Sequence, residues 1–220
     1  MKKVLWIAVF LLLAGCGASK PAPIWLSAGN SQLDNYKKHY LSDQDKIAAI
    51  EFNDALKEIK KSGDLELLAR THLIRMAVQT ATLQDLVSAE YLKIEAVHPS
   101  PANRNFYVFL QGEIAQVDAK LLPAQYLGFV ETLRRPGEGE RLRAIEQMED
   151  PVSQLIAVGI LVRMGQENEA ALQRAIATAS AEGWKKALLV YLSRLKAYYA
   201  GKQEMSRALD IEQRINLIKD

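Results

Sequence analysis

Apolar side chains recur along most of the chain at the spacing of an α-helix, and from Gln44 onward they almost nowhere alternate as in a strand. Each striped segment ends at a glycine or a proline, and several begin at Asp or Ser, the usual residues at helix ends. The first helix is expected to stop at Ser62-Gly63, and the second to start at Asp64. The predicted apolar positions of these two helices are Ala48, Phe52, Ala55, Leu56 and Ile59, and then Leu65, Leu68, Ala69 and Met76.

The middle of the chain repeats this alternation of helix and breaker. A helix over residues 86–96 should stop before His98-Pro99-Ser100-Pro101, because a residue that precedes proline resists helical geometry. A further stripe runs from Phe106 to Val117 and is broken before Pro123, and another covers residues 126–133. The pattern therefore predicts an all-α fold.

The last part of the chain, residues 136–220, is the most repeat-like. Gly165, Gly183 and Gly201 fall at intervals of eighteen residues, and each lies between two apolar stripes. Two such units span about thirty-six residues, close to the period of helix-pair repeats, which stack because one pair cannot bury its apolar face alone. We expect a solenoid of helix pairs within a domain of residues 44–220.

One half-repeat in this region resembles the tetratricopeptide family. Gly165, Ala170 and Ala177 have the spacing of that family's small residues. The resemblance implies a turn between two helices at the glycine and close helix packing at the two alanines. The helix before the turn departs from the family, because Gln154, Ala157 and Val158 stand where aromatic and Leu-Gly positions belong.

The chain begins with the three-part layout of a secretory signal in residues 1–15. Two lysines precede an apolar run of about ten residues, half the length of a membrane-spanning helix, and small residues follow. The segment Leu13-Ala14-Gly15-Cys16 resembles the bacterial lipobox. That resemblance implies cleavage between Gly15 and Cys16, and lipid attached to the Cys16 thiol as the membrane anchor.

The alternative for Cys16 is an ordinary signal with an incidental cysteine, but Cys16 is the only cysteine in the chain and has no disulfide partner. Two or more acyl chains would make a lasting tether. Gly17 is not the aspartate that commonly retains lipoproteins in the inner membrane of Gram-negative cells. We expect the periplasmic face of the outer membrane in such a cell, or otherwise the outer face of the plasma membrane.

Residues 16–43 are expected to form a flexible tether, because Gly, Ala, Ser, Pro and Asn dominate its first part. Its apolar knot, Ile24-Trp25-Leu26, either packs back onto the domain or docks on a partner or the bilayer. Without the signal, the chain carries 26 basic and 26 acidic side chains. This balance argues against a nucleic-acid partner, which requires a concentrated positive face.

No chemical motif stands out in the sequence. His39, His72 and His98 lack the close spacing of zinc ligands, and His72 shares a face with core residues. Glycine-framed nucleophile elbows and phosphate-binding loops are missing from the sequence. We predict no catalytic residue, no metal and no cofactor, and the sequence names no ligand-binding residue.

Two weaker hypotheses involve glutamates and aromatic residues. A glycan-cleaving enzyme needs a buried glutamate, and the candidates are Glu51, Glu113 and Glu131. None of them lies in the Glu-Ser context of lytic transglycosylases, so exposed or boundary positions are expected. The aromatic residues of a late helix are expected to be core, with an aromatic ligand groove as the alternative; they are Trp184, Tyr191, Tyr198 and Tyr199.

The functional expectation follows from the anchor and the helical stack. A solenoid offers an extended surface for peptides or helices, so we expect a non-enzymatic scaffold or adaptor for another cell-envelope protein. The alternatives are a peptidoglycan-acting enzyme or its activator, and a carrier for a lipid or small ligand.

Overall fold

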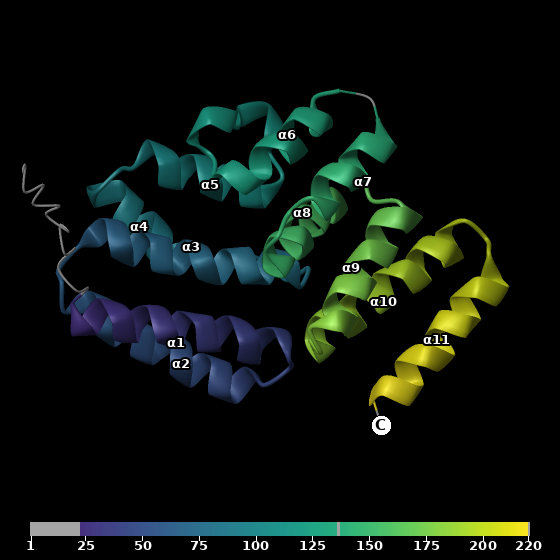
Figure 1. Cartoon of the computed structure of the whole chain (residues 1–220), viewed down its shortest axis with the longest axis horizontal. Helices are drawn as coiled ribbons and strands as arrows, with labels where there is room; N and C mark the ends of the chain where they lie inside the picture. Colours follow the sequence, from purple (N-terminus) through teal and green to yellow (C-terminus); the bar gives the residue numbers. More distant parts are fainter. Residues whose placement is uncertain (1–22, 136, 220) are drawn as a thin grey trace, which may run out of the picture.

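The computed structural model describes residues 23–135 and 137–219, and over these ranges the protein is built from helices without strands (Figure 1). The all-α prediction is confirmed. Three short 3-10 helices, η1 (Ile114–Gln116), η2 (Ala119–Leu121) and η3 (Ala124–Tyr126), interrupt the chain between α5 and α6. The α-helices are α1 (Ile24–Leu41), α2 (Asp45–Lys60), α3 (Leu65–Ala81), α4 (Ala89–Val97), α5 (Pro101–Gln111), α6 (Leu127–Leu133), α7 (Glu138–Glu146), α8 (Pro151–Arg163), α9 (Glu169–Ala181), α10 (Lys185–Gly201) and α11 (Met205–Lys219).

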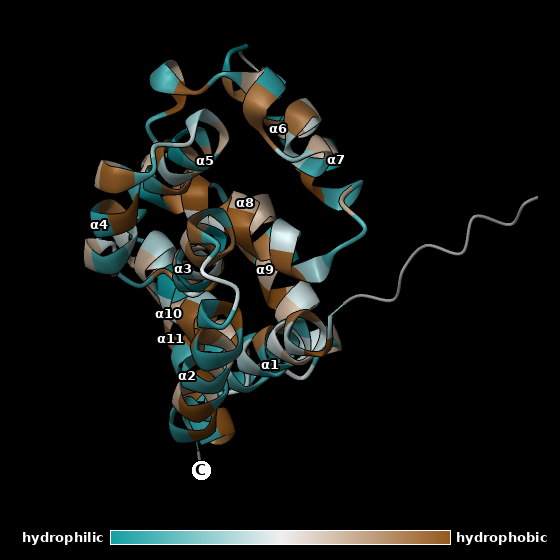
Figure 2. Ribbon diagram, turned by 90° about the vertical axis from the view of Figure 1, so that its left-hand side faces the viewer, coloured by the Kyte–Doolittle hydropathy of each residue, from teal (hydrophilic) through white to brown (hydrophobic). Residues whose placement is uncertain are grey.

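Most helices that are consecutive in the chain pack against each other, as in a solenoid. Figure 1 shows the α1–α2 hairpin below α3 in the N-terminal half, and α9, α10 and α11 in succession in the C-terminal half. Helices α3 and α8 pack against each other in the middle and join the two halves. Hydrophobic residues, brown in Figure 2, cover much of α8 and α9 at this centre. None of the helices within the described ranges is long and apolar enough to cross a membrane.

The contact between α3 and α8 depends on a glycine. A Cβ atom added at Gly159 of α8 would overlap the backbone carbonyl oxygen of Thr80 in α3 and lie 3.2 Å from its Cγ2 atom. Thr80 is fully buried, and its hydroxyl donates to the Met76 carbonyl oxygen at 3.1 Å. The two helix backbones therefore approach as closely as they do because residue 159 has no side chain.

The turns between helices follow a common pattern, in which a residue of left-handed conformation comes shortly before the next helix. Gly63, Gly165 and Gly183 fill this position with φ of +67°, +63° and +68°, as their places in the sequence predict. After α10 the position belongs to Gln203 (φ 64°), whereas Gly201 is the last residue of the helix. The eighteen-residue spacing therefore marks two of these turns and misses the third.

Of the two features that the tetratricopeptide resemblance implies, the structure has the turn at the glycine and lacks the close packing at the two alanines. Gly165 makes the turn between α8 and α9, but Ala170 and Ala177 are both exposed. The face of α9 that packs against its neighbours carries Ala171, Ala175 and Ala179 instead, all buried. The packing face of α9 is thus rotated from the one that the resemblance implies.

The expected tether over residues 16–43 is wrong for the part that forms α1. This eighteen-residue helix packs along α2 and buries Gly29, Leu33, Tyr36 and Leu41. In the apolar knot, Trp25 and Leu26 are half-buried and Ile24 is 90% exposed, so packing onto the domain accounts for two of its three residues. Residues 1–22, with the signal, Gly15 and the lipidation site Cys16, lie outside the described residues.

Candidate functional site

A cavity of about 520 Å³ forms an apolar groove between α3, α5 and the η2–η3 segment. A second hollow of about 160 Å³ shares Ile74, Phe106 and Pro123 with it and extends it toward α1 and α8. We call the two together the apolar groove. The apolar walls of its larger part consist of Leu73, Ile74, Ala102, Phe106, Leu121, Leu122 and Pro123.

The groove exists because α5 is short and the chain then folds back along it. Pro101 occupies the first turn of α5, and Gly112 ends the helix in the left-handed conformation with φ of +84°. The expected apolar stripe from Phe106 to Val117 is therefore broken at Gly112 and continues as 3-10 turns. One wall of the groove comes from these turns instead of a regular helix.

Polar contacts hold the 3-10 turns in place beside α5. The Asn105 side-chain amide donates to the Asp118 carbonyl oxygen at 2.9 Å, and the Asp118 N–H donates to Asn105 Oδ1 at 2.7 Å. Asp118 also caps η2, since its carboxylate accepts from the Lys120 N–H at 2.9 Å. The Arg134 guanidinium at the end of α6 donates to the Val117 carbonyl oxygen. These bonds give the groove a fixed wall.

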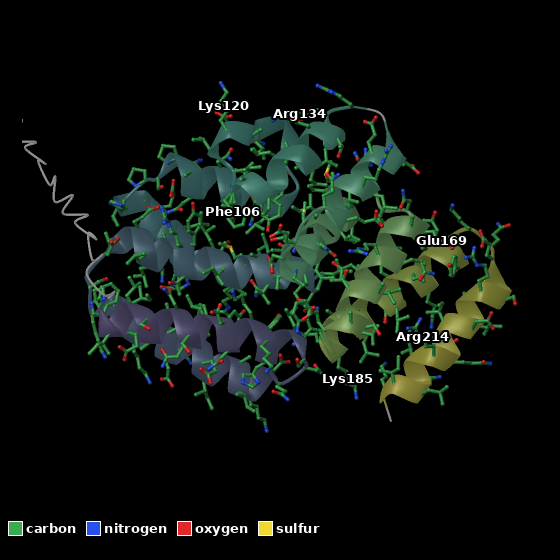
Figure 3. The ribbon with its side chains drawn as sticks, viewed as in Figure 1. Phe106, Lys120, Arg134, Glu169, Lys185 and Arg214 are labelled. Atoms are coloured by element: carbon green, nitrogen blue, oxygen red, sulfur yellow. The ribbon has the colours of Figure 1, made fainter. Side chains whose placement is uncertain are left out.

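The floor of the groove contains aromatic and branched side chains that remain partly open to solvent. Figure 3 shows Phe106 between α5 and α3. Its ring lies 6.0 Å from the rings of Phe109 and Tyr126, both of which are buried. Phe106 and Ile74 are half-buried, whereas Leu73 is buried beneath them. The floor therefore presents apolar surface to a ligand and is braced by aromatic residues behind it.

The rim of the groove is positively charged at one position. Arg70 is neutralised by Glu66, with 2.9 Å between the charged atoms, and Glu66 also accepts from the Asn103 amide at 2.9 Å. Lys120 is exposed and pairs with no carboxylate of the described chain. Figure 3 shows its side chain extending outward from the η2 segment. The larger part of the groove is therefore an apolar channel with a free ammonium group at its edge, whereas Lys37, paired with Asp34, and Asp150 line the smaller part.

The three candidate glutamates do not form a site. Glu113 and Glu131 are exposed, and Glu51 is half-buried on α2, where its carboxylate accepts from the Asn35 amide at 3.5 Å. None of the three lines the apolar groove. They occupy the exposed or boundary positions that we expect of ordinary helix glutamates.

The histidines are also separate from one another. His72 is buried on α3, with its ring centre 6.0 Å from that of Phe52, and burial lowers its pKa below 6.5. His39 lies near the end of α1 beside Gln44, and His98 is exposed after α4. The part of the chain that the structure describes holds no group of three or more His, Cys, Asp or Glu side chains arranged to bind a metal ion.

The aromatic residues of the late helix belong to the core. Trp184, Tyr191 and Tyr199 are buried, and Tyr198 is half-buried. The Tyr191 hydroxyl donates to the Leu155 carbonyl oxygen at 2.8 Å and so connects α10 to α8. Tyr199 donates to the Glu169 carboxylate at 3.0 Å. These residues join helices and do not line the apolar groove.

The groove residues were missed in the sequence because they look like core. Phe106 shares its stripe with Phe109 and Leu110, which are buried, and only the fold leaves its ring half-open. Pro123 was visible as a breaker, which is the one local signal near the groove. No protein-family model matches this sequence, and comparisons with curated proteins and with solved structures gave no match.

Proposed function

We propose that this protein is a lipid-anchored adaptor of the bacterial cell envelope, and that its apolar groove holds an amphipathic helix of a partner envelope protein. The lipobox-like segment Leu13-Ala14-Gly15-Cys16 supports the anchor. On this proposal Cys16 carries the lipid, and the domain faces the periplasm from the outer membrane of a Gram-negative cell. In a cell without an outer membrane, the same anchor places it on the outer face of the plasma membrane.

The observation that carries the adaptor role is the apolar groove with its half-open floor. Amphipathic helices bind such grooves by inserting apolar side chains spaced three or four residues apart. Phe106 and Ile74 offer apolar surface along the groove, and the volumes of its two parts exceed what one side chain fills. A helix with an apolar face is the occupant that matches this shape.

The charge at the rim of the groove favours a partner helix that carries an acidic residue. Lys120 has no carboxylate partner in the described chain, whereas Arg70 is already neutralised by Glu66. A partner helix with an acidic residue beside its apolar face would pair with Lys120 and fix the register of the helix. We therefore commit to an amphipathic helix with an acidic flank.

Site-specific crosslinking in the living cell tests this proposal. A photoreactive amino acid replaces Leu121, a groove residue that is 40% exposed, and in a separate strain replaces Leu217 of α11, which is 80% exposed. The expected result is one envelope protein crosslinked from position 121 and not from position 217. The crosslinked peptide should form an amphipathic helix with an acid on its flank.

A synthetic copy of the crosslinked segment then decides whether the groove recognises it. We expect it to bind the purified full chain and to bind a Lys120→Glu variant about tenfold more weakly, which corresponds to about 1.4 kcal/mol. Equal binding by both proteins would contradict the assigned charge contact. A lipid adduct at position 121, in place of a peptide, would replace the adaptor with a lipid carrier.

The anchor has a separate test. A Cys16→Ala variant should lose labelling by a fatty-acid analogue and accumulate with its signal uncleaved. Persistent labelling would show that lipid is attached elsewhere, and the anchor proposal would then be abandoned without affecting the groove.

A further inference from the structure

A second cavity of about 360 Å³ lies where α1, α2, α3 and α10 meet, and its chemistry differs from that of the apolar groove. We call it the polar pocket. Aromatic side chains and two cations line it, with one carboxylate among them; these residues are Tyr36, Tyr40, Asp45, Phe52, Arg75 and Lys186. The proposed adaptor role does not use any of them.

The hydroxyl of Tyr36 has no hydrogen-bond partner among the described residues, although the side chain is only 3% exposed. Its ring centre lies 5.0 Å from that of Phe52 and 5.6 Å from that of Tyr40, so the phenol is held firmly. Buried polar groups in proteins are nearly always hydrogen-bonded. A buried hydroxyl that the described residues leave unpaired beside a cavity is a hydrogen-bond donor that a ligand would satisfy.

The cations of the pocket are held by aromatic rings. The Arg75 guanidinium lies 5.2 Å from the centre of the Phe52 ring, and it makes no ion pair within the described chain. The Lys186 ammonium lies 4.1 Å from the centre of the Tyr40 ring and pairs with Asp45. Arg75 and Lys186 against Asp45 leave a formal charge of +1 in the pocket.

From this geometry we infer that the polar pocket binds an organic ligand through a single carboxylate group. The planar guanidinium of Arg75 matches the two oxygens of a carboxylate, and the Tyr36 hydroxyl is a donor for the same group. The formal charge of +1 suits a monoanion, whereas Asp45 would repel a phosphate dianion more strongly. The rings of Tyr36, Tyr40 and Phe52 provide apolar walls for whatever is attached to the carboxylate.

The carboxylate has two sources that share this chemistry, the C-terminus of a peptide chain and a small free acid. The probes are N-acetyl tripeptides with free carboxyl ends and varied last residues, the same tripeptides as amides, N-acetyl amino acids, and inorganic phosphate. Binding to the full chain is followed by NMR through the Arg75 Nε–H signal. We expect the acids to shift this signal with saturation, and the amides to leave it unchanged.

Variants locate the binding in the pocket. Lys186→Gln and Arg75→Gln should each weaken binding of the acids about tenfold, whereas Lys185→Gln should not change it. Because Arg75→Gln has lost the Arg75 signal, binding to the variants is followed through other signals that the acids shift. Lys185 is the matched control, because it precedes Lys186 on α10 and is exposed (Figure 3). Tyr36→Phe keeps the ring and removes only the unpaired hydroxyl, so it should fold and still bind about fivefold more weakly.

Tighter binding of tripeptide acids than of N-acetyl amino acids supports a peptide C-terminus, and equal binding supports a free acid. Phosphate binding as tight as that of the acids would overturn the carboxylate assignment. The site itself would be overturned if the Arg75 signal stayed unchanged at millimolar concentration of every probe. It would also be overturned if the Arg75→Gln, Lys186→Gln and Tyr36→Phe variants bound the acids as tightly as the unchanged protein does.

Discussion

The two cavities lie on different faces of helix α3, and one is lined mainly by apolar side chains whereas the other is lined mainly by polar and charged ones. Leu73 and Ile74 of α3 line the apolar groove, whereas Arg75 and Gln79 line the polar pocket. Ile74 and Arg75 are adjacent in the chain and project about 100° apart around the helix. A central, largely buried helix thus lines two cavities at once, and a single step along the sequence changes the chemistry of the cavity wall.

The remaining residues that line the two cavities differ in how widely they are separated in the sequence. The larger part of the groove is completed by residues 102–123, which include α5, η1 and η2. The polar pocket needs α1, α2 and α10, and its Lys186–Asp45 pair joins residues 141 positions apart. One site therefore depends on an irregular local segment, and the other on regular helices brought together by the whole fold.

The largest expected effect comes from a change that displaces the shared helix. Gly159→Ala places a Cβ atom against the Thr80 carbonyl oxygen, so α3 and α8 must separate. Overpacking of this kind costs typically 1–3 kcal/mol, and we expect about 3 kcal/mol because backbone atoms cannot rotate away. Urea unfolding of the full chain measures it. Gly128→Ala is the control, because no atom lies within 4 Å of the added Cβ, and equal losses in both variants would contradict the close approach.

A second change should affect one cavity and spare the other. Ala102→Trp fills the apolar groove from an exposed position in the first turn of α5. We expect the partner helix to bind at least about tenfold more weakly, since bulk at the site excludes its apolar face, while carboxylate binding in the polar pocket stays the same. Ala170→Trp, at the matching position of α9, should leave both unchanged. The measurement is a titration of each ligand against the unchanged protein and the two variants. Equal helix binding by all three proteins would contradict the groove as the binding site.

A third, smaller effect distinguishes the two buried tyrosine hydroxyls. Tyr36→Phe removes a hydroxyl without a partner in the described chain, so stability should rise by about 1 kcal/mol. Tyr126→Phe removes a buried hydroxyl that donates to Ser153 Oγ at 3.1 Å, so stability should fall by about 1 kcal/mol. Thermal and urea unfolding of both variants provide the measurement. A loss of stability in Tyr36→Phe would reveal a partner within the chain and weaken the case for a ligand.

The smallest effect is a dependence of stability on pH through His72. Burial, assisted by the charges of Arg75 and Lys60 and opposed by Glu90, lowers the pKa of His72 in the folded protein. The unfolded chain then takes up a proton near pH 6.5 that the folded protein does not, so stability falls as the pH drops through this value. His72→Gln should reduce this slope between pH 7 and pH 5, and His98→Gln, at an exposed position, should not. Identical slopes in all three proteins would contradict the assignment.

The sequence predicted the helices best where apolar positions and breakers agree. The stripe from Ala48 to Ile59 became α2, and Gly63 and Gly183 form turns. Helix α1 was missed because glycine, serine, asparagine and glutamine interrupt its apolar residues. Its buried positions at Gly29, Leu33 and Tyr36 do have helical spacing, which was the available signal.

Neither cavity could be inferred from the sequence, for different physical reasons. Phe106 is half-exposed only because the chain turns back at Gly112, and a local stripe does not encode that exposure. Arg75 and Lys186 each look like an ordinary solvated cation on a helix. Only tertiary packing brings them to one pocket beside an unpaired hydroxyl.

Because Asp45 and Lys186 are far apart in the sequence, only a nearly complete chain can form the polar pocket. A polypeptide that ends before α10, through incomplete synthesis or proteolytic trimming, would still contain α3, α5 and the turns that form the groove, but it would lack the Lys186 side of the polar pocket. All residues that line the groove precede α10, whereas the polar pocket also needs Lys186 of α10. Carboxylate binding in the polar pocket, if it occurs as proposed above, would therefore distinguish full-length molecules from truncated ones.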